Sequence, residues 1–201
     1  MYFRTLALAA ISIGSVFAAP TAVTGSDPKI LTSAISAVAD AKIAVDAQAV
    51  ITQNFVNGTV NDEVVPAVKA SLNNIAGELQ NLVDFVKALA TGVILPLADA
   101  ELNNIPGFVA DVKSISADIQ VTVNLILANL PAELKVLIKH ELLLVLAAVD
   151  PFVLPVLQFA NAAITGTSGS VTVTVSATIV QTRVIVAEID GPIYAAVNKI
   201  N

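Results

Sequence analysis

Residues 64–89 read VVPAVKASLNNIAGELQNLVDFVKAL, and the spacing of their apolar side chains decides the fold. Successive apolar positions are separated by alternating steps of three and four residues, which places them along one face of an α-helix. An isolated helix of this length would lose more conformational entropy than burial of one stripe returns, so partner helices are required. The stripe consists of Val65, Val68, Leu72, Ile75, Leu79, Leu82, Val86 and Leu89.

Helical spacing recurs on both sides of this segment and predicts an all-α fold, an antiparallel bundle of five or six amphipathic helices. Residues 171–178 remain open, because VTVTVSAT alternates as a strand does while the apolar residues around it keep helical spacing; a helix over 173–199 is favoured. The small residues TGTSGS predict a flexible linker near 165–172. The other predicted helices span 28–55, 62–89, 96–103, 108–130, 131–149 and 151–164.

Composition excludes several classes of function. The 201 residues are 56% hydrophobic but only 4% aromatic and 13% charged, with a formal net charge of −6. Two arginines and an acidic balance argue against nucleic-acid binding, because no basic surface is available to neutralise phosphates. The absence of cysteine excludes disulfides and cysteine-based zinc sites. We therefore expect no metal and no cofactor.

The N-terminus has the features of a secretory signal peptide. Arg4 precedes an apolar run at 6–17, and small residues follow up to Ala19, so we expect cleavage there and a single mature domain over 20–201. An uncleaved membrane anchor is the alternative. A second apolar stretch, 142–165, has Asp150, Pro151 and Pro155 near its centre, and this favours two shorter helices over a stable transmembrane span.

Catalytic motifs are not evident in the chain. His140 is the only histidine, and neither a nucleophile elbow nor a phosphate-binding glycine loop is present. A surface histidine at a helix edge is the simpler interpretation, so we expect a protein that is not an enzyme. Asn57-Gly58-Thr59 is a glycosylation sequon in a predicted loop, and it predicts a glycan on Asn57 in a secreted chain.

Three stretches carry a resemblance to a known family: AISAVADAKIAVDAQAV at 34–50, LNNIAGELQNLVDFVKAL at 72–89 and FVADVKSISADIQVTVNLILANLP at 108–131. The chain resembles the fungal hydrophobic surface-binding protein A family, which is related to the lipid-binding domains of fungal cell-wall mannoproteins. The resemblance implies a secreted, extracellular or wall-associated helical bundle that binds hydrophobic solids or long-chain fatty acids and assists secreted hydrolases. The chain departs from the family in its very apolar 134–157 region and in lacking a long Ser/Thr-rich tail.

The surplus of apolar side chains agrees with such a function, since a small bundle needs fewer of them for its core. The surplus would line an internal cavity, cover an exposed patch or form an interface between copies, and a packed structural or cell-wall bundle with no ligand is the alternative. The residues expected to line a bound apolar guest are Leu72, Ile75, Leu79, Leu82, Val86, Phe108, Val112 and Ile115.

Overall fold

The fold consists of long helices and short connections. The computed structural model describes residues 29–58, 64–93, 95 and 97–201, and the predicted signal peptide lies outside these residues. No strand occurs in the part of the chain that is described, so the predicted all-α bundle is confirmed. The elements are α1 (Lys29–Asn57), α2 (Val64–Gly92), α3 (Asp99–Leu102), α4 (Ile105–Asn129), α5 (Ala132–Ile164), α6 (Ser170–Glu188), the π-helical turn η1 (Ile189–Ile193) and α7 (Tyr194–Asn198).

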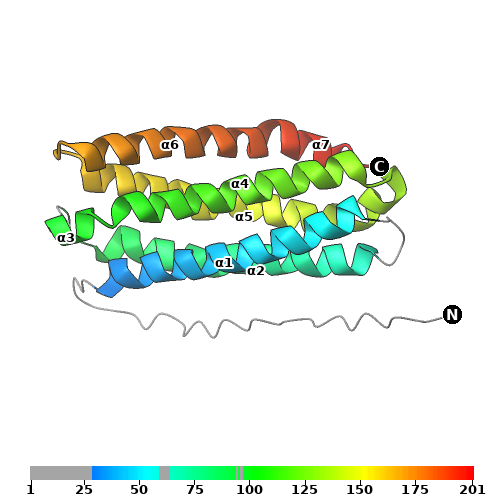
Figure 1. The fold of residues 1–201 in the computed structure, drawn as a ribbon, viewed down its shortest axis with the longest axis horizontal. Coiled ribbons are helices and arrows are strands. Elements are labelled where there is room, and N and C mark those ends of the chain that lie inside the picture. The colour runs from blue at the N-terminus through cyan, green and yellow to red at the C-terminus, as the bar shows by residue number, and fades with distance from the viewer. Residues whose placement is uncertain (1–28, 59–63, 94, 96) are drawn as a thin grey trace.

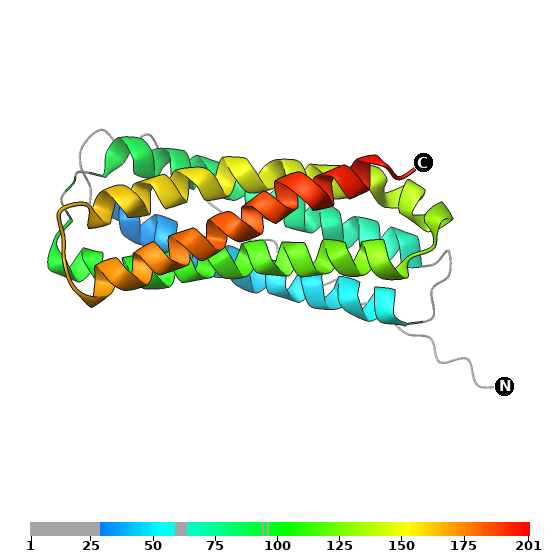
Figure 2. The ribbon, with the colours of Figure 1, turned by 90° about the horizontal axis from the view of Figure 1, so that it is seen from above.

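Four of the long helices form a ring, and the fifth lies outside it. Around the ring, α1 packs on α2, α2 on α5, α5 on α4, and α4 on α1. Helix α6 packs mainly on α4 and α5 among these helices and crosses them as an outer layer (Figures 1 and 2). The molecule is therefore a four-helix bundle with an extra helix on one side.

The stripe on α2 is covered by protein. All of its eight residues are at most 7% exposed, and they belong to one continuous core built by α1, α2, α4 and α5 with the inner face of α6. Helices α1 and α5 flank α2 and supply the partners that the spacing requires. The core is therefore closed around the stripe by neighbouring helices.

Helix α5 corrects the prediction of two helices that meet at Asp150 and Pro151. It is one helix of 33 residues that contains both Pro151 and Pro155. The two prolines are four residues apart and so share one face, where Pro151 and Ala147 are exposed. Carbonyl groups that lose an N–H donor to proline can meet water there, and the buried residues on the opposite face offset the cost of interrupting the helix.

The ambiguous segment 171–178 is helical, as the apolar spacing favoured. Two glycines with positive φ, Gly166 at 83° and Gly169 at 116°, form the connection from α5 and precede Ser170, the first residue of α6. Val175 and Ile179 are buried against the ring, and this packing outweighs the preference of alternating valine and threonine for strands. Near Gly191 and Pro192 the helix forms the π-helical turn η1, consistent with the missing N–H of Pro192.

Candidate functional site

The residues predicted to line a bound guest lie together, but in a closed core. Leu72, Ile75, Leu79, Leu82 and Val86 come from α2, and Phe108, Val112 and Ile115 come from α4. Each of the eight is at most 1% exposed and belongs to the same cluster of apolar side chains. Helices α2 and α4 lie diagonally across the ring, and a guest among these residues would have to displace packed core side chains, so their role in binding stays a prediction.

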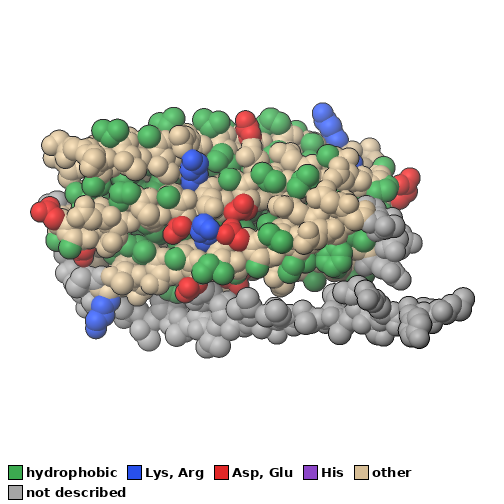
Figure 3. Space-filling view, viewed as in Figure 1, with side chains coloured by type: hydrophobic (Ala, Val, Ile, Leu, Met, Phe, Trp, Pro, Cys, Tyr) green, Lys and Arg blue, Asp and Glu red, His purple; other side chains and the backbone are tan. Residues whose placement is uncertain are grey.

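The outward face of α6 carries exposed apolar side chains. Val173, Val180 and Val184 are 70%, 62% and 57% exposed, and Tyr194 beyond η1 is 43% exposed. These residues and three small ones between them form a line that we call the outer stripe. Hydrophobic side chains are visible along this edge of the molecule, with few charged groups between them (Figure 3). The outer stripe consists of Val173, Ala177, Val180, Val184, Ala187, Gly191 and Tyr194.

The opposite face of α6 is also apolar. Val175, Ile179 and Val186 are at most 5% exposed and pack toward α4 and α5. A helix with apolar residues on two faces normally has partners on both sides. Here the described residues provide helix partners on one side only, and the outer stripe is left open to solvent.

Among the residues that the structure describes, two segments are long and apolar enough to cross a membrane, judged by length and composition alone. In Ala132–Ile164, 56% of the most apolar window is buried inside the bundle, whereas in Ser170–Asn198 only 22% is buried. The role of α5 in the core accounts for much of its apolar character. Packing among the described residues does not account for the apolar character of the C-terminal segment.

Other large apolar side chains are exposed as well, but they are distributed over several helices. Ile43, Val50 and Ile51 are on α1, and Val136 and Leu137 are on α5. Both helices use most of their remaining apolar residues in the core. These exposed residues are useful as controls, because they match the outer stripe in exposure and lie on other helices.

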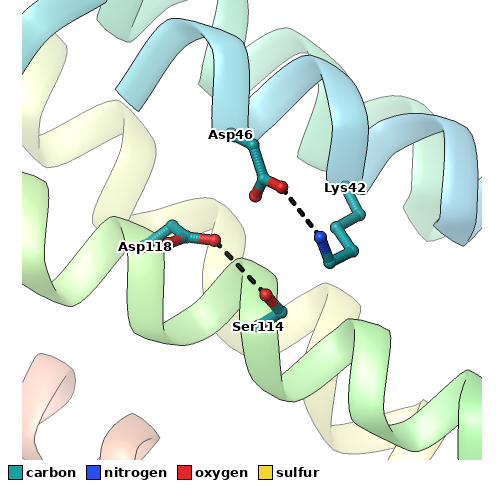
Figure 4. Close-up of polar contacts among 4 residues, drawn as sticks. All are labelled: Lys42, Asp46, Ser114 and Asp118. Atoms are coloured by element: carbon teal, nitrogen blue, oxygen red, sulfur yellow. Dashed lines mark hydrogen bonds and ion pairs between the residues drawn. The ribbon is translucent and has the colours of Figure 1, made fainter. Parts of the chain in front are cut away.

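A pair of carboxyl groups joins α1 to α4. Lys42 Nζ donates a hydrogen bond to Asp46 Oδ2 at 2.8 Å, and Ser114 Oγ donates one to Asp118 Oδ2 at 3.5 Å. Asp46 and Asp118 face each other across the two helices (Figure 4). Burial, the hydrogen bond to Asp46 and its charge raise the pKa of Asp118 to about 6.

The pKa of Asp46 is shifted in the opposite direction. Burial alone would raise the pKa of Asp46, but the hydrogen bonds from Lys42 and Asp118 lower it below its usual value. Asp46 Oδ1 is buried and has no donor when both carboxyl groups are ionised. A proton on Asp118 supplies that donor, so the pair is best satisfied when it shares one proton. Burial also raises the pKa of the neighbouring Asp111.

A second carboxyl pair joins α5 to η1. Burial, the hydrogen bond to Asp150 and its charge raise the pKa of Asp190 to about 6. Asp150 Oδ1 is buried without a donor, as Asp46 Oδ1 is in the first pair. Asp150, which the sequence offered as an argument against a membrane span, therefore contacts the C-terminal helix.

The remaining polar contacts suit helix packing. Glu141 is 8% exposed and lies 3.4 Å from Lys69 Nζ, while its neighbour His140 is exposed, as expected for a surface histidine. Between α1 and α2, Thr52 Oγ1 donates to Ser71 Oγ at 2.9 Å, and Ser71 Oγ donates to the Gln48 carbonyl at 2.8 Å. Within the described ranges, no cluster of three or more histidine, aspartate or glutamate side chains is arranged to hold a metal ion.

No protein-family model matches the chain, and neither does any curated protein or solved structure at a significant level. The outer stripe and the two carboxyl pairs are features that sequence reasoning missed. The outer stripe had a visible signal, because its valines also follow helical spacing. The carboxyl pairs had none, since Asp46 and Asp118 belong to different helices far apart in the chain.

Proposed function

We propose that the protein is a secreted, non-catalytic binder of hydrophobic surfaces and that the outer stripe of α6 makes the contact. The observation that carries this proposal is an outermost helix whose exposed face is apolar while its inner face already completes the core. Contact through this face requires no opening of the bundle. It therefore avoids the loss of core packing that insertion of a guest between α2 and α4 would cause.

The expected strength of this contact is modest for one copy. Complete burial of one large apolar side chain contributes roughly 1.5–3 kcal/mol, so the partly exposed residues of the outer stripe together contribute on the order of 5 kcal/mol. This free energy corresponds to a sub-millimolar dissociation constant for one copy of the protein at one position on a surface. An extended solid or lipid-like surface offers many equivalent positions, and such a surface is therefore a better match than a discrete ligand.

Charge favours an uncharged apolar surface over an anionic membrane. The chain has a formal net charge of −6, and Arg183 is the one basic residue in α6. Negatively charged lipid head groups would repel such a protein. Waxes, hydrophobic polymers and neutral lipid layers are the classes of surface that fit. A role in bringing secreted hydrolases to such solids is part of the same proposal.

Depletion from solution by uncharged apolar beads tests the proposed function, with extraction of the purified protein by organic solvent as the comparison. Depletion without co-purified lipid is the expected result. Co-purified fatty acid that is lost in a folded variant with polar residues at 72, 75 and 79 would instead indicate a carrier with an internal site. If neither depletion nor co-purified lipid were found, the proposed function would be contradicted, and a packed bundle without a ligand would be the remaining interpretation.

Secretion and glycosylation belong to the same proposal, with an extracellular or wall-associated location. Asn57 is the last residue of α1 and is exposed, and its Oδ1 accepts a hydrogen bond from Asn129 Nδ2 at 3.0 Å. Its own Nδ2, the atom that would carry the sugar, is not used in that bond. Mass spectrometry of secreted protein should find a mature N-terminus near residue 20 and a mass at Asn57 that N-glycosidase removes. An intact Met1 in a membrane fraction would contradict this.

A further inference from the structure

The outer stripe repeats with the period of a coiled coil. From Val173 to Ala187 its positions alternate in steps of four and three residues over two heptads of α6, which is the pattern of the a and d positions of paired helices. Gly191 and Tyr194 continue the spacing in the sequence but lie in and beyond the π-helical turn η1. With Val184 at position a, Val180 and Ala187 occupy d positions. The inner face, with Val175, Ile179 and Val186, corresponds to c and f positions and packs on the bundle. The a and d face is thus free for a partner helix.

The charges beside the outer stripe specify which partner fits. In this heptad register Arg183 is at position g and Glu188 is at position e, and both are exposed. Arg183 makes no ion pair within the part of the chain that the structure describes. Glu188 accepts a hydrogen bond from Gln120, and its carboxylate has capacity for a further donor.

In a parallel pair of helices, a g residue faces the e residue that lies five positions further along the partner. Two copies of α6 in parallel would therefore place Arg183 of each copy beside Glu188 of the other, forming two equivalent ion pairs. Ser176 and Gln181 would face each other by the same rule. An antiparallel pair places g beside g and e beside e, which would leave both charges without an opposite partner.

We infer that a second copy of this chain covers the outer stripe in solution, through a symmetric and parallel pairing of α6 with α6. Helix α6 is the outermost layer, so the two bundles would lie on opposite sides of the helix pair (Figure 2). Valine, alanine and glycine along the seam permit close approach of the two helices. This inference does not rest on the proposed function, although adsorption through the same stripe would require the two copies to separate.

Single cysteines test the pairing directly, because the natural chain contains none. Val173→Cys, Val180→Cys and Ala187→Cys each place a thiol at a d position, and in a parallel symmetric pair each thiol faces its own counterpart. Mild oxidation should therefore yield disulfide-linked dimers with all three variants. Ile43→Cys on α1, which is equally exposed, should form no disulfide-linked dimer, because it lies outside the paired helices. Cross-linking at only one of the three positions would indicate an antiparallel pair and overturn the inference.

Charge reversal provides a second test that leaves every apolar residue in place. Arg183→Glu and Glu188→Arg should each weaken the dimer at least tenfold in sedimentation or light scattering, and the double variant should restore it. Arg183→Glu should still adsorb to apolar beads at least as strongly as the natural protein. A natural chain that is still monomeric at about 1 mM, above the dissociation constant that burial of the stripe alone predicts, would overturn the inference. Adsorption of that monomer would show that the stripe serves only the surface.

Discussion

Replacement of Val180 and Val184 by glutamate should lower adsorption to uncharged apolar beads at least tenfold. The two valines are 62% and 57% exposed, so the change removes apolar contact area and places two charges where the surface would lie. Loss of one such side chain from an apolar contact costs about 1–2 kcal/mol, and tenfold corresponds to about 1.4 kcal/mol. Adsorption isotherms of the natural protein and the double variant measure the difference.

The fold should survive this change. Both positions face solvent, and glutamate has a higher helix propensity than valine. Circular dichroism and thermal unfolding should therefore be nearly unchanged. Ile43→Glu is the matched control, since Ile43 is 64% exposed but lies on α1. An equal loss of adsorption in this control, or full adsorption by the double variant, would contradict the assignment to α6.

Thermal stability should be higher near pH 4.5 than at pH 7.5, because of the two carboxyl pairs. The pKa values of Asp118 and Asp190 are raised to about 6 in the folded protein, whereas an unfolded aspartate titrates near 3.9. Between these two pKa values the folded state binds more protons than the unfolded state does. The free energy of unfolding therefore falls as the pH rises. The contribution is fully present below about pH 4 and is lost above about pH 6.

At still lower pH, protonation of Asp46 begins to lower the stability of the folded protein. The pKa of Asp46 is lowered by its hydrogen bonds with Lys42 and Asp118, which outweigh burial, so protonation of Asp46 at lower pH costs stability. Maximum stability is therefore expected between about pH 4 and 5. With an allowance for solvent screening, each pair contributes about 1 kcal/mol, which corresponds to a change in Tm of about 2–4 °C per pair.

Asparagine in place of Asp118 and Asp190 separates the pairs from general charge repulsion. A side-chain amide at either position can donate a hydrogen bond to the facing aspartate at any pH, so Asp118→Asn with Asp190→Asn should flatten the curve of Tm against pH. Self-repulsion of the acidic chain has the same sign but would persist in this variant. A natural protein whose Tm rises from pH 4.5 to 7.5 would contradict the shared-proton interpretation.

The helical bundle could be predicted from the sequence because the apolar spacing that indicates each helix is a local pattern. The residues from Val65 to Leu89 repeat with a helical period that a β-strand does not satisfy, and burial of all eight confirms the spacing. The continuity of α5 was not predictable in the same way. Pro151 and Pro155 indicate a break when only local propensity is considered, and the tertiary packing of Phe152, Val153 and their neighbours decides otherwise.

The candidate site could be predicted less well from the sequence, for two physical reasons. Helix α6 is apolar on both faces, so periodicity alone cannot tell which of Val175 or Val180 faces the core. Only the position of α6 outside the ring resolves this. The carboxyl pairs join residues from different helices, and a contact between Asp150 and Asp190 depends on how α5 and η1 cross.

Accessibility of single cysteines in the adsorbed protein tests the central claim most directly. In a chain with no natural cysteine, Val184→Cys reports on the outer stripe, Ile43→Cys on an equally exposed site of α1, and Leu72→Cys on the buried core. At concentrations where the protein is monomeric, adsorption to apolar beads should protect position 184 from a maleimide reagent. Position 43 should stay reactive and position 72 unreactive. Continued reactivity at 184, or a newly reactive position 72 that indicates an opened bundle, would contradict binding through the outer face of α6.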